Sequence, residues 1–258
     1  MRPALLIWLA FAFTAESWAA NKPNIVLVFT DDQGWTDTSV QMMSDRPDSK
    51  SDIYSTPALE RMARSGMVFS NAYACAPTCT PSRAGIQFGK TPCRLRQTVV
   101  HDTLAAERGI DCRDETSIAE MIKSVDPNYV TAHFGKWGFH PRSPEHAGYD
   151  QSDGNTNNGE VDYLDVKERT PRPADDPKRI FSVTRRANKF MESQVEADRP
   201  FFMQVSHYAV HVGHSARKET VASYRDLLRG RDRTSLSNIE SIAAYAAMVG
   251  DLDEEIAS

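Results

Sequence analysis

The sequence predicts an α/β domain with a mainly parallel sheet and helices on both faces. Apolar, β-branched runs alternate along the chain with segments of helical periodicity, and this alternation is typical of sheets built from strand–helix–strand units. A chain of 258 residues is long enough for one sizeable domain with its own core. No repeat or interdomain linker interrupts the pattern.

Four predicted strands and six predicted helices make up this pattern. The first strand, residues 24–30, is a continuous apolar run, so we expect it to be buried on both faces. Residues 138–177 are rich in Pro, Gly, Asp and Asn and are predicted to be mostly loop. The further strands are predicted at 67–74, 129–134 and 200–206, and the helices at 56–64, 82–88, 116–123, 178–196, 219–228 and 239–257.

The first twenty residues differ from the rest and are predicted to be a signal peptide. Arg2 gives a positive start, and residues 4–13 form an apolar run. Ser17 and Ala19 place small side chains at the −3 and −1 positions of a cleavage site, with cleavage expected after Ala19 or Ala20. A buried N-terminal helix is the alternative, and the run is too short for a membrane span. We expect residues 21–258 to form the mature domain of a secreted or periplasmic protein with no membrane association.

Charge and cysteine content narrow the class of protein. The net charge of −5 argues against nucleic acid as a partner, because proteins that bind it are more often basic. Export permits disulfides, but the four cysteines fit neither a disulfide framework nor a zinc motif. The pairing of Cys75, Cys93 and Cys112 stays open.

Three predicted strands end in polar clusters, at Asp31-Asp32, at Lys136 and at His207 and His211. The carboxyl ends of parallel strands meet at one edge of a sheet, where ligands bind, so we expect these side chains to converge. Adjacent carboxylates repel unless a cation joins them, which suggests a hard divalent metal. An Asp-Asp pair in a turn is also common as a solvated turn.

A fourth cluster, Cys-Thr-Pro-Ser-Arg, occupies residues 79–83 at the start of a predicted helix. Helix starts bind anions, and Arg83, within one turn of Cys79, can present its planar fork to an oxyanion. The alternative is a buried structural cysteine beside a surface arginine.

Taken together, these blocks resemble the sulfatase family of the alkaline-phosphatase-like superfamily. Residues 79–83 resemble its Cys-x-Pro-Ser-Arg signature, and residues 24–32 its amino-terminal strand with an acidic pair. Residues 134–137 resemble its Gly-Lys-Trp element, and residues 201–211 its strand that ends in a substrate-side histidine. The resemblance implies an alkaline-phosphatase-like sulfatase N-terminal domain.

The resemblance also implies the chemistry of a sulfuric ester hydrolase. Cys79 would be oxidised to formylglycine by a formylglycine-generating enzyme, and the hydrated aldehyde would attack sulfur with one hydroxyl and release sulfate with the other. Asp31, Asp32 and residue 79 would bind Ca²⁺. The substrate would be a sulfated small molecule or carbohydrate.

Further roles follow from the same resemblance. Arg83 would stabilise the formylglycine, Lys136 would hold a sulfate oxygen, and His211 would contact the sulfate or assist proton transfer. We interpret His207 as structural, and we interpret residues 153–157 as a surface loop because they lack the glycine and distal glutamate of an EF-hand.

The chain departs from the family pattern in two places. Gly138 stands where the family often has a histidine directly after Gly-Lys-Trp, and His140 lies two residues further on. The later Asp-Asn pair that completes the family's calcium shell is absent, because Asp251 and Asp253 fall within a predicted helix. We therefore expect a fold incomplete at its C-terminal end, weak calcium binding and poor turnover.

Two other classes of function remain open at this point. One is a non-catalytic secreted binding protein, or a degenerate fragment, on the same scaffold. The other is a phosphomonoesterase or phosphodiesterase, although those enzymes usually have Ser or Thr where this chain has Cys79.

Overall fold

The computed structural model describes residues 22–100, 114–138, 142–157, 173–230 and 238–258. The predicted signal peptide, Cys112 and His140 lie outside these residues. None of the helices in the described part of the chain is long and apolar enough to cross a membrane.

The described strands form one parallel sheet, which confirms the predicted fold class. The sheet has the order β1-β4-β2-β3, and the strands are β1 (Ile25–Phe29), β2 (Val130–Gly135), β3 (Gln151–Ser152) and β4 (Phe201–Ser206). The register places Gln204 of β4 between Leu27 of β1 and His133 of β2. All residues of β2 and β4 are buried, as expected of strands covered on both faces.

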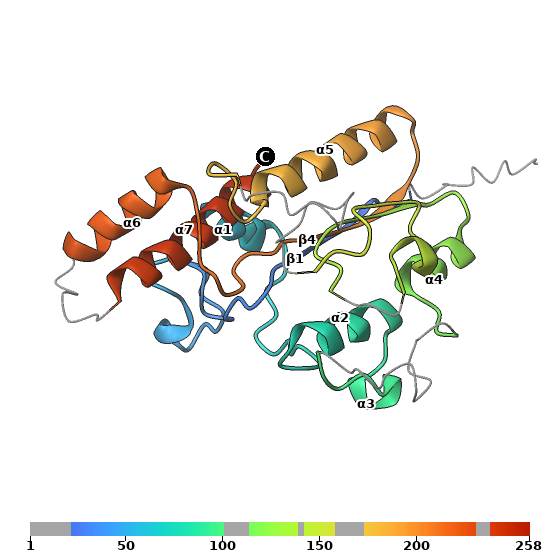
Figure 1. The fold of residues 1–258 in the computed structure, drawn as a ribbon, viewed down its shortest axis with the longest axis horizontal. Helices are drawn as coiled ribbons and strands as arrows, with labels where there is room; N and C mark the ends of the chain where they lie inside the picture. The colour runs from blue at the N-terminus through green and yellow to red at the C-terminus, as the bar shows by residue number, and fades with distance from the viewer. Residues whose placement is uncertain (1–21, 101–113, 139–141, 158–172, 231–237) are drawn as a thin grey trace, which may run out of the picture.

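Helices cover the sheet on both sides (Figure 1). α5 (Ile180–Glu196) packs on one face, where it meets alternate apolar residues such as Met203 and Val205 of β4. α2 (Cys79–Phe88) and α4 (Ile118–Val125) lie on the other face, where Phe202 belongs to their apolar cluster. Because side chains alternate along a strand, the two faces of β4 carry different chemistry.

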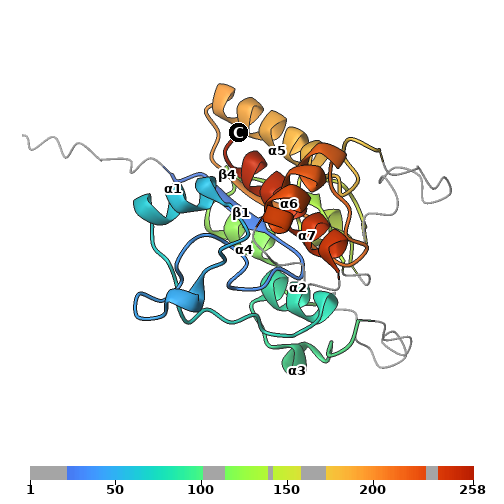
Figure 2. The same cartoon turned by 90° about the vertical axis from the view of Figure 1, so that its left-hand side faces the viewer.

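The remaining helices lie next to this layered centre. α1 (Pro57–Ser65) and α6 (Lys218–Gly230) both pack against α7 (Ile239–Ile256), as Figure 2 shows from the end of the molecule. Three short elements complete the described chain: α3 (Pro92–Leu95) and the 3-10 helices Pro47–Ser49 and Glu145–Ala147.

Two expectations about strands are wrong. Residues 67–74 do not form a strand, and Met67, Phe69 and Tyr73 are exposed instead of lying beside another strand. β1 is buried on neither face completely, since it pairs only with β4 at the edge of the described sheet and Val26 stays 44% exposed. The apolar sequence of β1 reflects a buried environment that the described residues supply only in part.

The predicted helices are confirmed with small shifts at their ends. Ser117 caps the start of α4: the Ser117 hydroxyl accepts from the backbone N–H of Glu120, and the Glu120 carboxylate accepts from the backbone N–H of Ser117. The short β3 and α3 lie in segments where no regular element was expected.

The amino end of α1 is capped from α7. Asp253 is buried, and its two carboxylate oxygens accept from the backbone N–H groups of Ala58 and Leu59 at 2.8 and 2.9 Å. Thr56 precedes the helix without capping it through its side chain. Asp253 therefore satisfies two N–H groups that no residue of α1 can satisfy.

We predict that Asp253→Ala lowers the free energy of unfolding by about 1–3 kcal/mol, because it leaves these buried donors unpaired. Asp253→Asn keeps one acceptor oxygen and should lower the free energy of unfolding by less than Asp253→Ala does. Urea unfolding followed by circular dichroism measures both, and equal losses in the two variants would contradict the capping role.

Candidate active site

A buried cluster of charges joins three elements at the carboxyl edge of the sheet. Asp31 follows β1, Lys136 follows β2, and Arg83 belongs to the first turns of α2. The Lys136 ammonium lies 2.5 Å from Asp31 Oδ2, and Arg83 Nη2 lies 3.2 Å from Asp31 Oδ1. The structure thus brings together three of the residues singled out in the sequence.

Backbone contacts hold the members of this cluster in place. The N–H of Lys136 donates to the carbonyl of Ser206 at 2.7 Å, which extends the pairing of β2 with β4. The Arg83 guanidinium also donates to the Lys136 carbonyl and lies 5.1 Å from the centre of the Phe29 ring. Lys136 has no exposed surface, so its charge is balanced by Asp31 and not by water.

Asp32 and His211 form the exposed side of the same edge. Asp31 exchanges backbone hydrogen bonds with Ala209 and Val210, and this pairing continues the alignment of β1 with β4. It brings His211 Nε2 to 3.8 Å from Asp32 Oδ2. The Asp32 side chain is 48% exposed, so this carboxylate faces solvent while its neighbour Asp31 is buried.

Cys79 is the first residue of α2 and is partly exposed. It is a free thiol, as are the other two described cysteines, Cys75 and Cys93. Arg83 lies one turn further along the same helix. An anion at residue 79 would therefore meet the positive end of the helix dipole as well as the nearby guanidinium.

Gly138, the first departure from the family pattern, packs directly against the charge cluster. It has a φ of +64°, and a Cβ atom there would lie 3.0 Å from Arg83 Cδ and 3.3 Å from Lys136 Cε. A larger residue would strain the backbone and crowd both cations. The carbonyl of Gly138 accepts from the Thr80 hydroxyl at 2.9 Å, which ties this loop to the start of α2.

The loop at residues 153–157 supports the site and is not a plain surface loop. Asp153 and Thr156 are buried. Asp153 accepts from the N–H of Gly135 at 2.7 Å, and Thr156 binds the backbone of Gly135 and Trp137. Sequence reasoning missed this role, because the only local signal is an acidic residue close after a very short strand.

His207 lies inside the protein, in keeping with a structural role. Its side chain is buried, its Nδ1 atom has no hydrogen-bond partner among the described residues, and burial lowers its pKa to about 4. His133 is buried as well, and burial together with the charge of Arg83 lowers its pKa to about 3. Both imidazoles are therefore neutral in the folded protein near neutral pH.

The described residues match a calcium site only in part. Asp31 and Asp32 are adjacent carboxylates at a strand end, and each oxygen of Asp31 keeps a lone pair beyond its contact with Arg83 or Lys136. Calcium takes six to eight oxygen ligands. Among the residues that the structure describes, no group of three or more His, Cys, Asp or Glu side chains could hold a metal ion.

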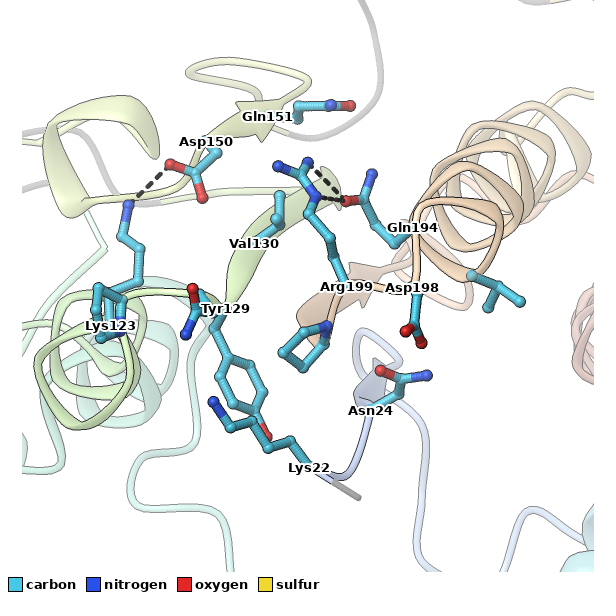
Figure 3. A pocket seen from close by; sticks show the side chains of 14 residues that line it. Lys22, Asn24, Lys123, Tyr129, Val130, Asp150, Gln151, Gln194, Asp198 and Arg199 are labelled. Carbon is cyan, nitrogen blue, oxygen red and sulfur yellow. Dashed lines mark hydrogen bonds and ion pairs between the residues drawn. The ribbon is translucent and has the colours of Figure 1, made fainter. Parts of the chain in front are cut away.

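A separate pocket of about 1140 Å³ opens at the opposite end of the sheet. It lies where the strands begin, near Asn24, Val130 and Pro200. Figure 3 shows that two of its cations have partners in the pocket: Lys123 pairs with Asp150, and Arg199 donates to the Gln194 side-chain oxygen. None of the residues singled out in the sequence lines this pocket.

The structure is that of an α/β protein with a buried charge cluster at the carboxyl edge of a parallel sheet. The Sulfatase family profile matches residues 23–258, and the chain therefore belongs to the sulfatase family.

Individual relatives agree with this assignment. Arylsulfatase G of Rattus norvegicus is 28% identical over 241 residues, which are 78% of this chain and 43% of that protein. N-acetylgalactosamine-6-sulfatase of Homo sapiens is 34% identical over 151 residues, 55% of this chain and 27% of that protein. The chain thus spans less than half the length of these relatives.

Solved structures share the fold. Ps i-CgsB superposes with a TM-score of 0.69 at 22% identity, over 92% of this chain and 53% of that one. It has also been solved in complex with k-i-k-neocarrahexaose. At this identity the likeness concerns the fold alone.

We predict that Asp31→Asn lowers the free energy of unfolding by about 3–5 kcal/mol, because it leaves Lys136 and Arg83 buried without a counter-charge. Asp48→Asn is the matched control, since it breaks an exposed ion pair with Arg46 and should leave stability unchanged. Urea unfolding of the three proteins measures the effect. A loss in Asp31→Asn no larger than in the control would contradict the buried pairing.

We also predict that stability falls with acidification between about pH 6.5 and 5. The unfolded chain binds protons at both imidazoles below their ordinary pKa of 6.5, whereas the folded chain keeps His207 and His133 neutral down to pKa values of about 4 and 3. Each histidine thus contributes up to about 1.4 kcal/mol per pH unit to the loss. Unfolding measured in steps across this range should show a smaller slope in His207→Gln, and an unchanged slope would contradict the buried neutral state.

Proposed function

We propose that the protein is a sulfuric ester hydrolase whose reactive residue is formylglycine made from Cys79. The observation that carries the proposal is the placement of Cys79 at the start of α2, one turn before the Arg83 that binds Asp31 and the Lys136 carbonyl. Membership of the sulfatase family supports it. The modifying partner would be a formylglycine-generating enzyme.

Each residue at the edge then has a distinct task. The modified residue 79 supplies the nucleophilic oxygen. Arg83 and the amino end of α2 stabilise negative charge close to it. His211, partly exposed beside Asp32, is placed to exchange a proton with a bound group that faces solvent.

The main role of Lys136 would be to hold the Asp31 carboxylate in place. Its ammonium is fully buried and lies against that carboxylate, so a direct contact with a sulfate oxygen requires the side chain to turn away from Asp31. With its ammonium on Asp31 Oδ2, Lys136 fixes the position of that carboxylate.

We propose that Asp31 and Asp32 supply two of the ligands of a Ca²⁺ ion, with residue 79 as a third. When bound, the ion would strengthen the positive field that draws in a sulfate ester. The partial donor set among the described residues is consistent with weak calcium binding by this chain.

We further propose a secreted or periplasmic location and a sulfated small molecule or carbohydrate as substrate. The amino-terminal sequence supports export. The name of a relative, N-acetylgalactosamine-6-sulfatase, supports a sulfated sugar.

The modification is tested by mass spectrometry of the peptide that contains Cys79, with protein made in a host that has the modifying enzyme. We predict an aldehyde at residue 79, aryl sulfate hydrolysis that rises with added calcium, and loss of activity in Cys79→Ala on the order of 10³-fold or more. Cys93→Ala, which changes an exposed thiol in α3, is the matched control.

The same preparation separates the alternatives. An unmodified thiol and no turnover would favour a non-catalytic binding protein on this scaffold. Faster hydrolysis of phosphate than of sulfate esters would favour a phosphoesterase.

A further inference from the structure

α2 rests on the sheet through buried polar side chains as well as apolar ones. Gln87 of α2, Gln204 of β4 and Tyr149 are each at most 3% exposed. The Tyr149 hydroxyl donates to Gln87 Oε1 at 2.9 Å, and Gln87 Nε2 donates to Gln204 Oε1 at 2.8 Å. None of these residues was singled out in the sequence, and none belongs to the charge cluster.

The hydrogen bonds continue along the sheet. Gln204 Nε2 donates to the Ser206 hydroxyl at 2.9 Å, and Ser206 Oγ lies 3.3 Å from His133 Nε2. Gln204 and His133 are register partners on adjacent strands. The two glutamine amides are thus held between α2 and the two central strands, and every residue in this chain of hydrogen bonds is buried.

The opposite face of the sheet provides the contrast. α5 packs there through its own apolar residues, including Val183, Ala187 and Phe190, which meet apolar residues of β2 and β4. Apolar contacts carry little directional preference and tolerate small rotations of a helix, whereas a hydrogen bond weakens steeply once its geometry is lost. A buried amide pair therefore fixes the rotation of α2 more tightly than apolar packing would.

The position of Gln87 connects this pair to the site. Gln87 lies four residues after Arg83, so both project from one face of α2. Arg83 binds Asp31 after β1, and Gln87 binds Gln204 in the middle of β4. Arg83 and Gln87 lie one turn apart on α2 and bind different parts of the sheet. Together they define the rotation and the tilt of α2, which begins at Cys79.

We propose that Gln87, Gln204 and Tyr149 are positioning residues: their buried hydrogen bonds set the rotation of α2 on the sheet and thereby fix where residue 79 lies, at the start of the helix whose Arg83 binds Asp31. The consequence for catalysis rests on the proposed function of residue 79. The geometric claim does not, and it can be tested on the unmodified thiol.

The test compares variants that separate stability from position. Gln87→Leu alone leaves Gln204 without its helix partner and should destabilise the protein. In Gln87→Leu/Gln204→Leu both amides are replaced by apolar groups of similar size, which can restore stability but cannot restore the directional contact. Tyr149→Phe removes one hydroxyl. Tyr129→Phe is its matched control, because among the described residues the Tyr129 hydroxyl donates to the Pro23 carbonyl at the other end of the sheet.

The readout is the iodoacetamide alkylation rate of Cys79 relative to that of exposed Cys93, measured by peptide mass spectrometry at one pH. The protein is the full chain from a host that lacks the modifying enzyme, so no turnover is needed. We expect the ratio to rise about threefold or more in the double variant and in Tyr149→Phe, because the start of α2 is no longer held and exposes its thiol more often. Tyr129→Phe should keep the wild-type ratio.

A double variant with wild-type stability and a wild-type ratio would overturn the proposal, because the amides would then be merely structural. If the double variant does not fold, Tyr149→Phe tests the proposal instead. A wild-type alkylation ratio in Tyr149→Phe would also overturn it. In modified protein that hydrolyses aryl sulfate, the same variants should lower kcat on the order of tenfold with little change in KM. A shifted ratio in a protein without turnover would support the positioning role and count against the proposed function alone.

Discussion

The arrangement of the candidate site depends on the burial of Asp31 between Lys136 and Arg83. A carboxylate with so little contact with water is costly unless cations and hydrogen bonds compensate it, and removing one partner leaves the others uncompensated. The three residues come from β1, β2 and α2, so their pairing fixes the end of two strands relative to the start of one helix. Cys79 takes its place from this constraint, because it begins the helix that carries Arg83.

The two faces of the sheet contribute differently to the stability of the fold and to the position of α2. The face under α5 is packed by apolar residues of the helix and of the strands. The face under α2 combines apolar packing with buried amides and a neutral imidazole, whose directional hydrogen bonds specify one geometry. This polar chemistry lies on the face whose helix begins with Cys79, the proposed reactive residue, where a small displacement would have the greatest consequence.

Much of the fold follows from local sequence patterns, because periodicity and strand ends are local properties. The carboxyl-edge rule correctly grouped Asp31, Lys136 and the residues that follow β4. Long-range partners are not local properties: nothing near Lys136 in the sequence indicates that its ammonium is buried on Asp31, and a lone Gln87 in a helix does not predict a partner 117 residues away. Residues 67–74 have strand-like composition, yet a strand exists only where a neighbour completes its ladder.

The charge balance of the site explains how Asp31 can pair with buried cations and still face a metal ion. Asp31 and Asp32 carry two negative charges, and Arg83 and Lys136 carry two positive ones, so the described edge is formally neutral when His211 is neutral. A neutral cluster can fold without a metal ion, and the remaining lone pairs of Asp31 and the exposed carboxylate of Asp32 can still face a cation. A divalent ion would leave the edge with a net positive charge, a field that would attract the proposed sulfate ester. Among the described residues, the number of oxygen ligands near Asp31, and not the charge of its neighbours, would limit the affinity for such an ion.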